Sequence, residues 1–202
     1  MVNTPTFAEE TFLLELPKTL SLYVTQEQFT ILSQANRDLK LERTATGELI
    51  VNPPTGWETG RFNSSISGEL YLWWRNFGES GLVFDSSTGF ILPNGATRSP
   101  DACWVSGERW QALTPEQKGT FANICPDFVV ELRSSSDKLE SLQAKMKEYI
   151  DNGAKLGWLI DRQNQQVEIY RVNQKVEIIS SPINLSGEKV LPNFTLDLTE
   201  IL

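Results

Sequence analysis

The sequence predicts one α/β (α+β) domain over residues 1–202, in which helices flank a mixed β-sheet. Two long segments repeat apolar residues every three or four positions, as amphipathic helices do, and several short apolar or alternating segments are typical of strands. The apolar content is 40%, with six Trp and ten Phe, as in a globular chain long enough to bury a core. Residues 1–20 are expected to form a flexible or peripheral segment.

The first third of the chain combines two helices with a hairpin. Residues 25–38 predict a short amphipathic helix that starts near Thr25. Residues 39–54 predict a hairpin that turns at Gly47 and ends at two prolines. Residues 57–77 predict the first long helix. Its apolar stripe is expected to be buried and comprises Phe62, Ile66, Leu70, Trp73 and Phe77.

Four strands are expected between the two long helices. Residues 81–85 and 89–93 are expected to pair with each other, and residues 100–106 form the next strand. A short helix introduced by Thr114 and Pro115 follows. The segment PDFVVELRS, residues 126–134, predicts the central strand of the sheet.

The second long helix is expected over residues 134–153. Ser134 and Asp137 have the spacing of a capping box, and Asn152 and Gly153 have the composition of a helix end. Three further strands are expected after this helix, at residues 156–161, 166–171 and 175–180.

The chain contains no histidine, which excludes several kinds of active site. Ser-His-Asp and Cys-His catalysis, His-ligated zinc and imidazole bases all require it. Chemistry would have to come from carboxylates, Lys, Arg, Tyr or the backbone, and a carboxylate site selects hard cations such as Mg²⁺ or Mn²⁺. The two cysteines, Cys103 and Cys125, are too few for a disulfide framework and are interpreted as core residues.

The net charge of −8 bears on the partners of the protein. A polyanion would be repelled over most of such a surface, so any contact with nucleic acid has to be local or assisted. The sequence has neither an 18-residue apolar run nor a basic and then apolar leader, and it predicts a cytoplasmic protein without membrane contact.

One carboxylate interrupts the apolar central strand. A bare buried carboxylate is costly, so Glu131 has to be solvated, paired or bound to a cation. Strand alternation places Glu131 and Arg133 on one face, and a salt bridge of Glu131 with Arg133 or with another basic residue at the edge of the sheet is one interpretation. If residues 100–106 form the neighbouring strand, Asp101 and Glu131 can converge on one ion instead.

A lysine lies on the border of the apolar stripe of the second long helix. At 100° per residue, Lys145 falls on the side of Leu142 and Tyr149, whereas Lys147 faces water. A border lysine either snorkels to solvent or reaches a site at the end of the strand, and the pattern leaves both open.

These residues resemble a known group of enzymes. Pro100-Asp101, followed thirty positions later by Glu131-Leu132-Arg133, resembles the PD-(D/E)XK nuclease superfamily, which has the restriction-endonuclease-like fold. RSPDACWVS, PDFVVELRSSSD, KMKEYIDNGAKLGWLID and VEIYR resemble the Uma-type restriction endonuclease family over roughly residues 39–171. The PD and E-x-K elements are weakly specific, whereas the string of serine-rich loop, K-x-x-x-Y helix, glycine stop and W-x-I-D strand is strongly specific.

The resemblance implies a metal site and its ligands. Asp101 and Glu131 would bind Mg²⁺ or Mn²⁺, and the carbonyl oxygen of Leu132 would add a ligand. A glutamate from the first core helix often contributes in such nucleases, and Glu58 is the match here. The usual E-x-K lysine is Arg133, which stays protonated and could hold a phosphate or a carboxylate but could not act as a base. Lys145 matches the position of a lysine on the following helix and is expected on the base side of the reaction.

Three functions are compatible with this pattern. The first is a Mg²⁺-dependent DNA endonuclease, expected to be a homodimer, that hydrolyses phosphodiester bonds with a metal-activated water. The second is a catalytically inactive protein of the same fold that serves as a binding or assembly module, with Glu131 held by Arg133. The third is a metal-dependent hydrolase of a small phosphate ester.

Overall fold

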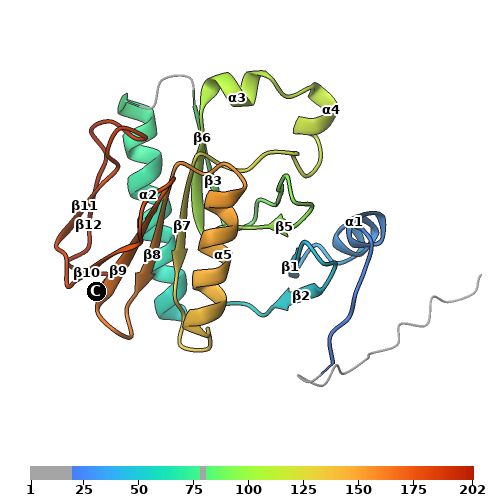
Figure 1. Cartoon of the computed structure of the whole chain (residues 1–202), viewed down its shortest axis with the longest axis horizontal. Coiled ribbons are helices and arrows are strands. Elements are labelled where there is room, and N and C mark those ends of the chain that lie inside the picture. The colour runs from blue at the N-terminus through green and yellow to red at the C-terminus, as the bar shows by residue number, and fades with distance from the viewer. Residues whose placement is uncertain (1–19, 78–80) are drawn as a thin grey trace, which may run out of the picture.

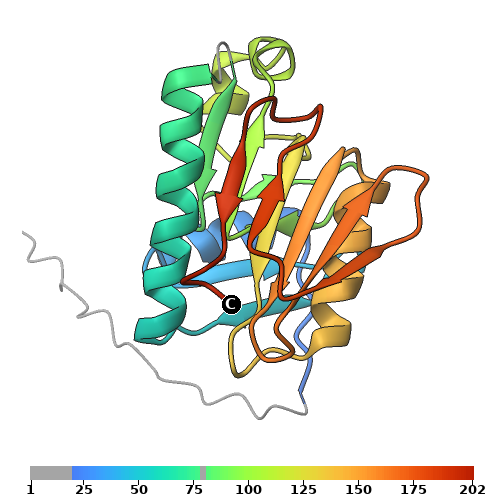
Figure 2. The same ribbon diagram turned by 90° about the vertical axis from the view of Figure 1, so that its left-hand side faces the viewer.

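The computed structural model describes residues 20–77 and 81–202. The segment expected to be flexible or peripheral, residues 1–20, lies outside them except for Leu20. A mixed sheet forms the centre, with α2 (Trp57–Phe77) on one face and α5 (Leu139–Asp151) on the other, as Figures 1 and 2 show. The predicted fold class, a mixed sheet flanked by helices, is confirmed.

The central sheet has six strands in the order β10-β9-β8-β7-β6-β3. Only β7 and β8 run parallel among these neighbours, and α5 provides the crossover between them. The segment PDFVVELRS lies in the interior of the sheet, as predicted. The strands are β3 (Leu82–Asp85), β6 (Ala102–Val105), β7 (Phe128–Leu132), β8 (Leu156–Asp161), β9 (Gln166–Arg171) and β10 (Glu177–Ser180).

A second sheet has four strands in the order β2-β1-β5-β4. It contains the predicted hairpin and lies near α1 (Gln26–Ala35), which Thr25 caps through a capping box with Gln28. The expected pairing of residues 81–85 with 89–93 is wrong, because β3 pairs with β6 and β4 pairs with β5. The strands are β1 (Lys40–Arg43), β2 (Leu49–Asn52), β4 (Phe90–Ile91) and β5 (Thr97–Arg98).

The remaining elements are short. α3 (Gly107–Gln111) and α4 (Pro115–Lys118) follow β6, and Thr114 caps α4 as predicted. A small antiparallel sheet of β11 (Asn184–Ser186) and β12 (Thr195–Asp197) packs on the α2 side of the central sheet. β5, β11 and β12 were not predicted, because two or three residues are too few to show alternation.

The two long helices agree with the sequence in most respects. α2 has the predicted bounds and buries the predicted stripe except Phe77, its last residue, whose side chain is exposed. α5 begins at Leu139 rather than at Ser134, because the carboxylate of Asp137 accepts the amide of Ser134 in a turn before the helix. It ends as predicted at Asn152 and Gly153, whose φ of +111° favours glycine.

The core lies in two layers, one on each face of the central sheet. On one face, residues of α2 and of the β11–β12 sheet pack against Phe128, Val130 and Trp158. On the other face, Met146 and Tyr149 of α5 join the second sheet, and Cys103 and Cys125 are buried and free there. The interpretation of the cysteines as core residues is confirmed. Among the helices of residues 20–77 and 81–202, none is long and apolar enough to cross a membrane.

Candidate active site

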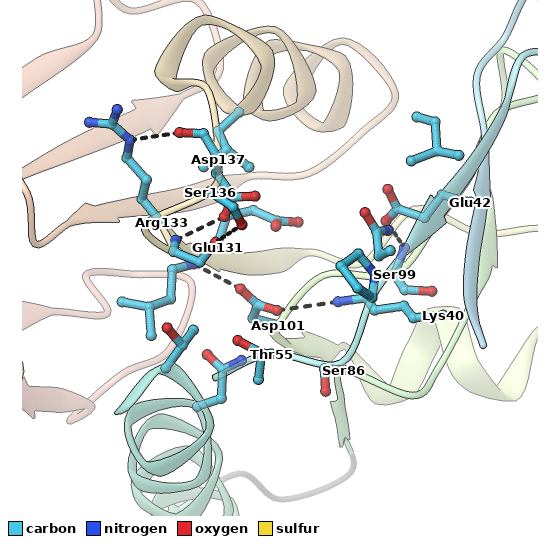
Figure 3. A pocket seen from close by; sticks show the side chains of 18 of the residues that line it. Lys40, Glu42, Thr55, Ser86, Ser99, Asp101, Glu131, Arg133, Ser136 and Asp137 are labelled. Carbon is cyan, nitrogen blue, oxygen red and sulfur yellow. Dashed lines mark hydrogen bonds and ion pairs between the residues drawn. The ribbon is translucent and has the colours of Figure 1, made fainter. Parts of the chain in front are cut away.

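A cavity of about 1360 Å³ opens at the end of β7. Its wall comes from β1, the loop before β6, the end of β7, and the first turns of α2 and α5. Asp101 and Glu131 both line this cavity, together with Lys40 and Glu42 from the second sheet, as Figure 3 shows. Residues from both sheets therefore meet at one place.

The carboxylates of Asp101 and Glu131 are brought together by strand pairing. β6 and β7 are antiparallel neighbours with Ala102 opposite Val130, which places Asp101 beside Glu131 on the same face. The amide of Asp101 donates to the carbonyl of Val130 at 3.0 Å. The Oδ2 atom of Asp101 accepts the amide of Leu132 at 2.9 Å, and its Oδ1 atom lies 3.3 Å from the Nζ atom of Lys40. The expected adjacency of these two strands is confirmed.

Glu131 is a buried carboxylate with two hydrogen-bond donors. Its side chain is 4% exposed, and its Oε1 atom accepts the hydroxyl of Tyr149 at 3.0 Å and the ammonium of Lys145 at 2.8 Å. Burial raises the pKa of Glu131 to about 7; the charge of Lys145 acts against this rise, and the charge of Asp101 adds to it. A cation bound beside Glu131 would favour its ionised form.

Lys145 sits between two carboxylates. Its Nζ atom lies 2.8 Å from the Oε1 atom of Glu131 and 2.8 Å from the Oε1 atom of Glu42, and it donates to the carbonyl of Ser99 at 3.4 Å. Burial alone would lower the pKa of Lys145, but the charges of Glu131 and Glu42 raise it above its ordinary value. In this arrangement Lys145 is held as an ammonium between two carboxylates, and its expected role on the base side stays a prediction.

Glu42 is a site residue that sequence reasoning missed. It is buried on β1, accepts the amide of Ser99 at 2.7 Å and lies 3.6 Å from the guanidinium of Arg98, which also binds Glu148. Burial acts to raise the pKa of Glu42, but Lys145 and Arg98 outweigh it and lower the pKa. Alternation in KLER places Lys40 and Glu42 on one face, yet nothing in the hairpin indicates that this face meets the central sheet.

Glu58 does not lie beside the other carboxylates. Its side chain is 76% exposed on the first turn of α2, where its Oε2 atom is 3.5 Å from the guanidinium of Arg162. It lines the rim of the cavity. Its expected contribution to the metal site therefore has no support from the geometry, and the second acid that the fold brings to Lys145, beside Glu131, is Glu42.

Arg133 forms its salt bridge with Asp161 and not with Glu131. Its guanidinium binds Asp161 at 3.0 Å and the carbonyl of Asp137 at 3.3 Å, and Figure 3 shows it directed away from Asp101. The salt bridge between Glu131 and Arg133 is wrong, because Arg133 follows the last residue of β7 and lies next to the end of β8, where Asp161 is buried. Of its two expected roles, Arg133 has that of a carboxylate partner.

The donor set at the end of β7 fits a hard divalent cation. Asp101 and Glu131 supply carboxylate oxygens. The amide of Leu132 donates to Asp101, and the carbonyl of Leu132 projects to the same edge of the strand as this amide. Within residues 20–77 and 81–202, no group of three or more His, Cys, Asp or Glu side chains is arranged to hold a metal. Two carboxylates and a carbonyl suit Mg²⁺, which keeps several water ligands.

Comparisons with known proteins identify a family and a similar fold. The family model described as "Uma2: Putative restriction endonuclease" matches residues 26–199. The fold is similar to the crystal structure of "a putative nuclease belonging to DUF820" from Anabaena variabilis ATCC 29413, with a TM-score of 0.66 and 20% identity over 78% of this chain and 87% of that chain. Comparison with curated proteins found no match. Because the family model spans most of the chain, the chain belongs to the Uma2 restriction endonuclease family, as the resemblance implied.

Proposed function

We propose that the protein is a metal-dependent endonuclease that hydrolyses phosphodiester bonds of DNA. The observation that carries the proposal is the meeting of Asp101 and Glu131 from neighbouring strands on one cavity wall, beside two lysines. These carboxylates and the carbonyl of Leu132 would hold Mg²⁺ or Mn²⁺. When bound, the metal lowers the pKa of a water ligand and offsets charge on the phosphate.

The side chains around the carboxylates have separate tasks in this proposal. Lys145 contributes a fixed positive charge beside the phosphate, and this charge stabilises the transition state. Glu42 is a positioning residue, because it holds the ammonium of Lys145 from the side opposite Glu131. Lys40 holds Asp101 in the same way from β1.

The charge of the cavity supports an anionic substrate. Seven basic and seven acidic residues line the cavity, so its wall is neutral although the chain as a whole carries −8. The excess negative charge therefore lies elsewhere on the chain, and a polyanionic strand meets less repulsion at the cavity than over the rest of the molecule. A local contact with nucleic acid would therefore form at this cavity.

Two other readings have less support. The inactive binding module was expected to hold Glu131 with Arg133, which binds Asp161 instead. A small phosphate ester needs far less space than a cavity of about 1360 Å³, which exceeds the usual range for small-molecule pockets. Cleavage of supercoiled and linear DNA with Mg²⁺ or Mn²⁺ tests the proposal against both. The homodimer and the cytoplasmic location stay predictions.

Divalent metal is expected to stabilise the folded protein. A ligand that binds only the native state at about 100 times its Kd adds about 2.7 kcal/mol, so millimolar Mg²⁺ or Mn²⁺ should raise the Tm by several degrees. Asp101→Asn should abolish the rise, because it removes one ligand charge. Glu58→Gln is the matched control and should keep the rise. A wild-type Tm that is unchanged by millimolar metal would contradict the proposed site.

Glu42 and Glu58 are expected to differ in their effect on cleavage. Glu42→Gln should lower the rate of DNA cleavage by about 10- to 100-fold, the usual effect of losing an outer partner of a metal site. Glu58→Gln should leave the rate almost unchanged, because Glu58 contacts only Arg162 among its described ion-pair partners. The rates are measured on supercoiled plasmid after circular dichroism shows both variants folded. Equal losses of cleavage rate in the two variants would mean that Glu58 contributes to the site as much as Glu42 does.

A further inference from the structure

Trp57 is the one tryptophan of the chain that is exposed. Its side chain is 97% exposed at the first position of α2, whereas the other five tryptophans, all within the described ranges, are buried or half-buried. An indole usually contributes to stability by burying its large apolar surface. Trp57 makes almost no such contribution, so packing of the fold does not explain a tryptophan at this position.

Trp57 stands on the wall of the candidate active site. It lines the same cavity as Asp101 and Glu131, together with Pro53 and Pro54, which precede it. Thr55, two residues before Trp57, also lines this cavity, and Figure 3 shows it on the cavity wall with Asp101. The indole therefore belongs to the same cavity as the two carboxylates.

Basic groups lie on the same rim. The guanidinium of Arg162 lies 3.9 Å from the ring centre of Phe62 and 3.5 Å from Glu58, and Lys138 also lines the cavity. A strand that enters the cavity would meet these charges with its phosphates while its bases face the indole. An aromatic side chain with cationic neighbours along a groove is the arrangement by which proteins hold single strands.

We propose that Trp57 stacks on an unpaired base of the DNA strand that enters the cavity. The inference rests on the proposed function and specifies its substrate class, DNA with a single-stranded segment. Bases inside a duplex have both faces covered by their neighbours, so only an unpaired base offers a free face to the indole. Stacking of this kind tolerates any base, because every base has a π-face.

Three variants test the inference by binding. The probes are a fluorescein-labelled single-stranded oligonucleotide and its blunt duplex, with Kd measured by anisotropy in EDTA so that no cleavage occurs. Trp57→Ala should weaken single-strand binding by about 5- to 150-fold, the usual range for one base–aromatic stack. Trp57→Phe should recover most of the affinity. Tyr71→Ala is the matched control, since Tyr71 is exposed on the same helix outside the cavity wall, and it should bind as wild type.

Tryptophan fluorescence gives a second readout. Unlabelled single strands should quench the emission of the wild-type protein, because a stacked base contacts the exposed indole, and this quenching should disappear in Trp57→Phe. Quenching that persists in Trp57→Phe would contradict the assignment to Trp57.

The outcomes separate this inference from the nuclease proposal. If wild type cleaves DNA and Trp57→Ala binds single strands as tightly as wild type, the stacking role is wrong and the nuclease proposal stands. If wild type neither binds nor cleaves any DNA, both are wrong. If wild type binds single strands through Trp57 but does not cleave, the nuclease proposal alone fails. If Trp57→Ala changes only the sedimentation coefficient, Trp57 belongs to a surface for self-association and the stacking role is overturned.

Discussion

Glu131→Gln is expected to lower metal-dependent cleavage of DNA by roughly 10²- to 10³-fold, the scale of losing one preorganised electrostatic group. Glutamine has the shape of glutamate and can still accept the hydroxyl of Tyr149, so the substitution removes the charge and leaves the packing in place. The measurement is the single-turnover rate on supercoiled plasmid with Mg²⁺ and with Mn²⁺. Activity that survives the substitution would mean a contaminant or a different site.

The stability of the same variant provides the control for folding. Because burial raises the pKa of Glu131 to about 7, the native state binds this proton more tightly than the unfolded state. This tighter binding of the proton by Glu131 stabilises the native state fully below the unfolded pKa, and the stabilisation is lost as the pH rises through about 7. In EDTA, the Tm of wild type should fall relative to that of Glu131→Gln across this range. Parallel pH profiles would contradict the raised pKa.

Lys145→Met is expected to lower the free energy of unfolding of the metal-free protein by about 3–5 kcal/mol, the usual cost of removing one member of a buried ion pair. The substitution leaves the buried carboxylates of Glu42 and Glu131 facing each other without the ammonium between them. The loss should shrink at acid pH, where Glu131 takes up a proton. It is measured by urea denaturation in EDTA on either side of pH 7.

The control for this variant is two residues away on the same helix. Lys147 is exposed, and Lys147→Met should change the free energy of unfolding by no more than about 0.5 kcal/mol, as surface substitutions usually do. If Lys145→Met were as stable as Lys147→Met at every pH, the two ion pairs of Lys145 would contribute nothing to the fold.

The sequence contains enough information to place the two central carboxylates. Alternation along PDFVVELRS puts Glu131 on a defined face, and Asp101 joins it once residues 100–106 form the neighbouring strand, as consecutive strands often do and as the structure shows. Lys145 also follows in part, since its position on the border of an apolar stripe allows it to reach the strand. These signals are local, and local patterns are what a single sequence shows well.

The rest of the site depends on how distant segments pack. Lys40 and Glu42 belong to a hairpin in a different sheet, and only the packing of the two sheets brings Lys40 to Asp101 and Glu42 to Lys145. Glu58 was assigned by the position of a helix in related nucleases, whereas its exposed side chain shows that position along a helix does not fix the direction of a carboxylate. The mispairing of β3 with β4 has the same origin, because proximity in sequence does not decide which sheet a strand joins.

The charged groups of the cavity come from three separate regions of the chain. During translation Lys40 and Glu42 are synthesised first, Asp101 next, and Glu131 and Lys145 last. A nascent chain on the ribosome holds no complete set of these groups until Lys145 has emerged and the hairpin has docked. The arrangement of charges that forms the site therefore exists only in the completed fold.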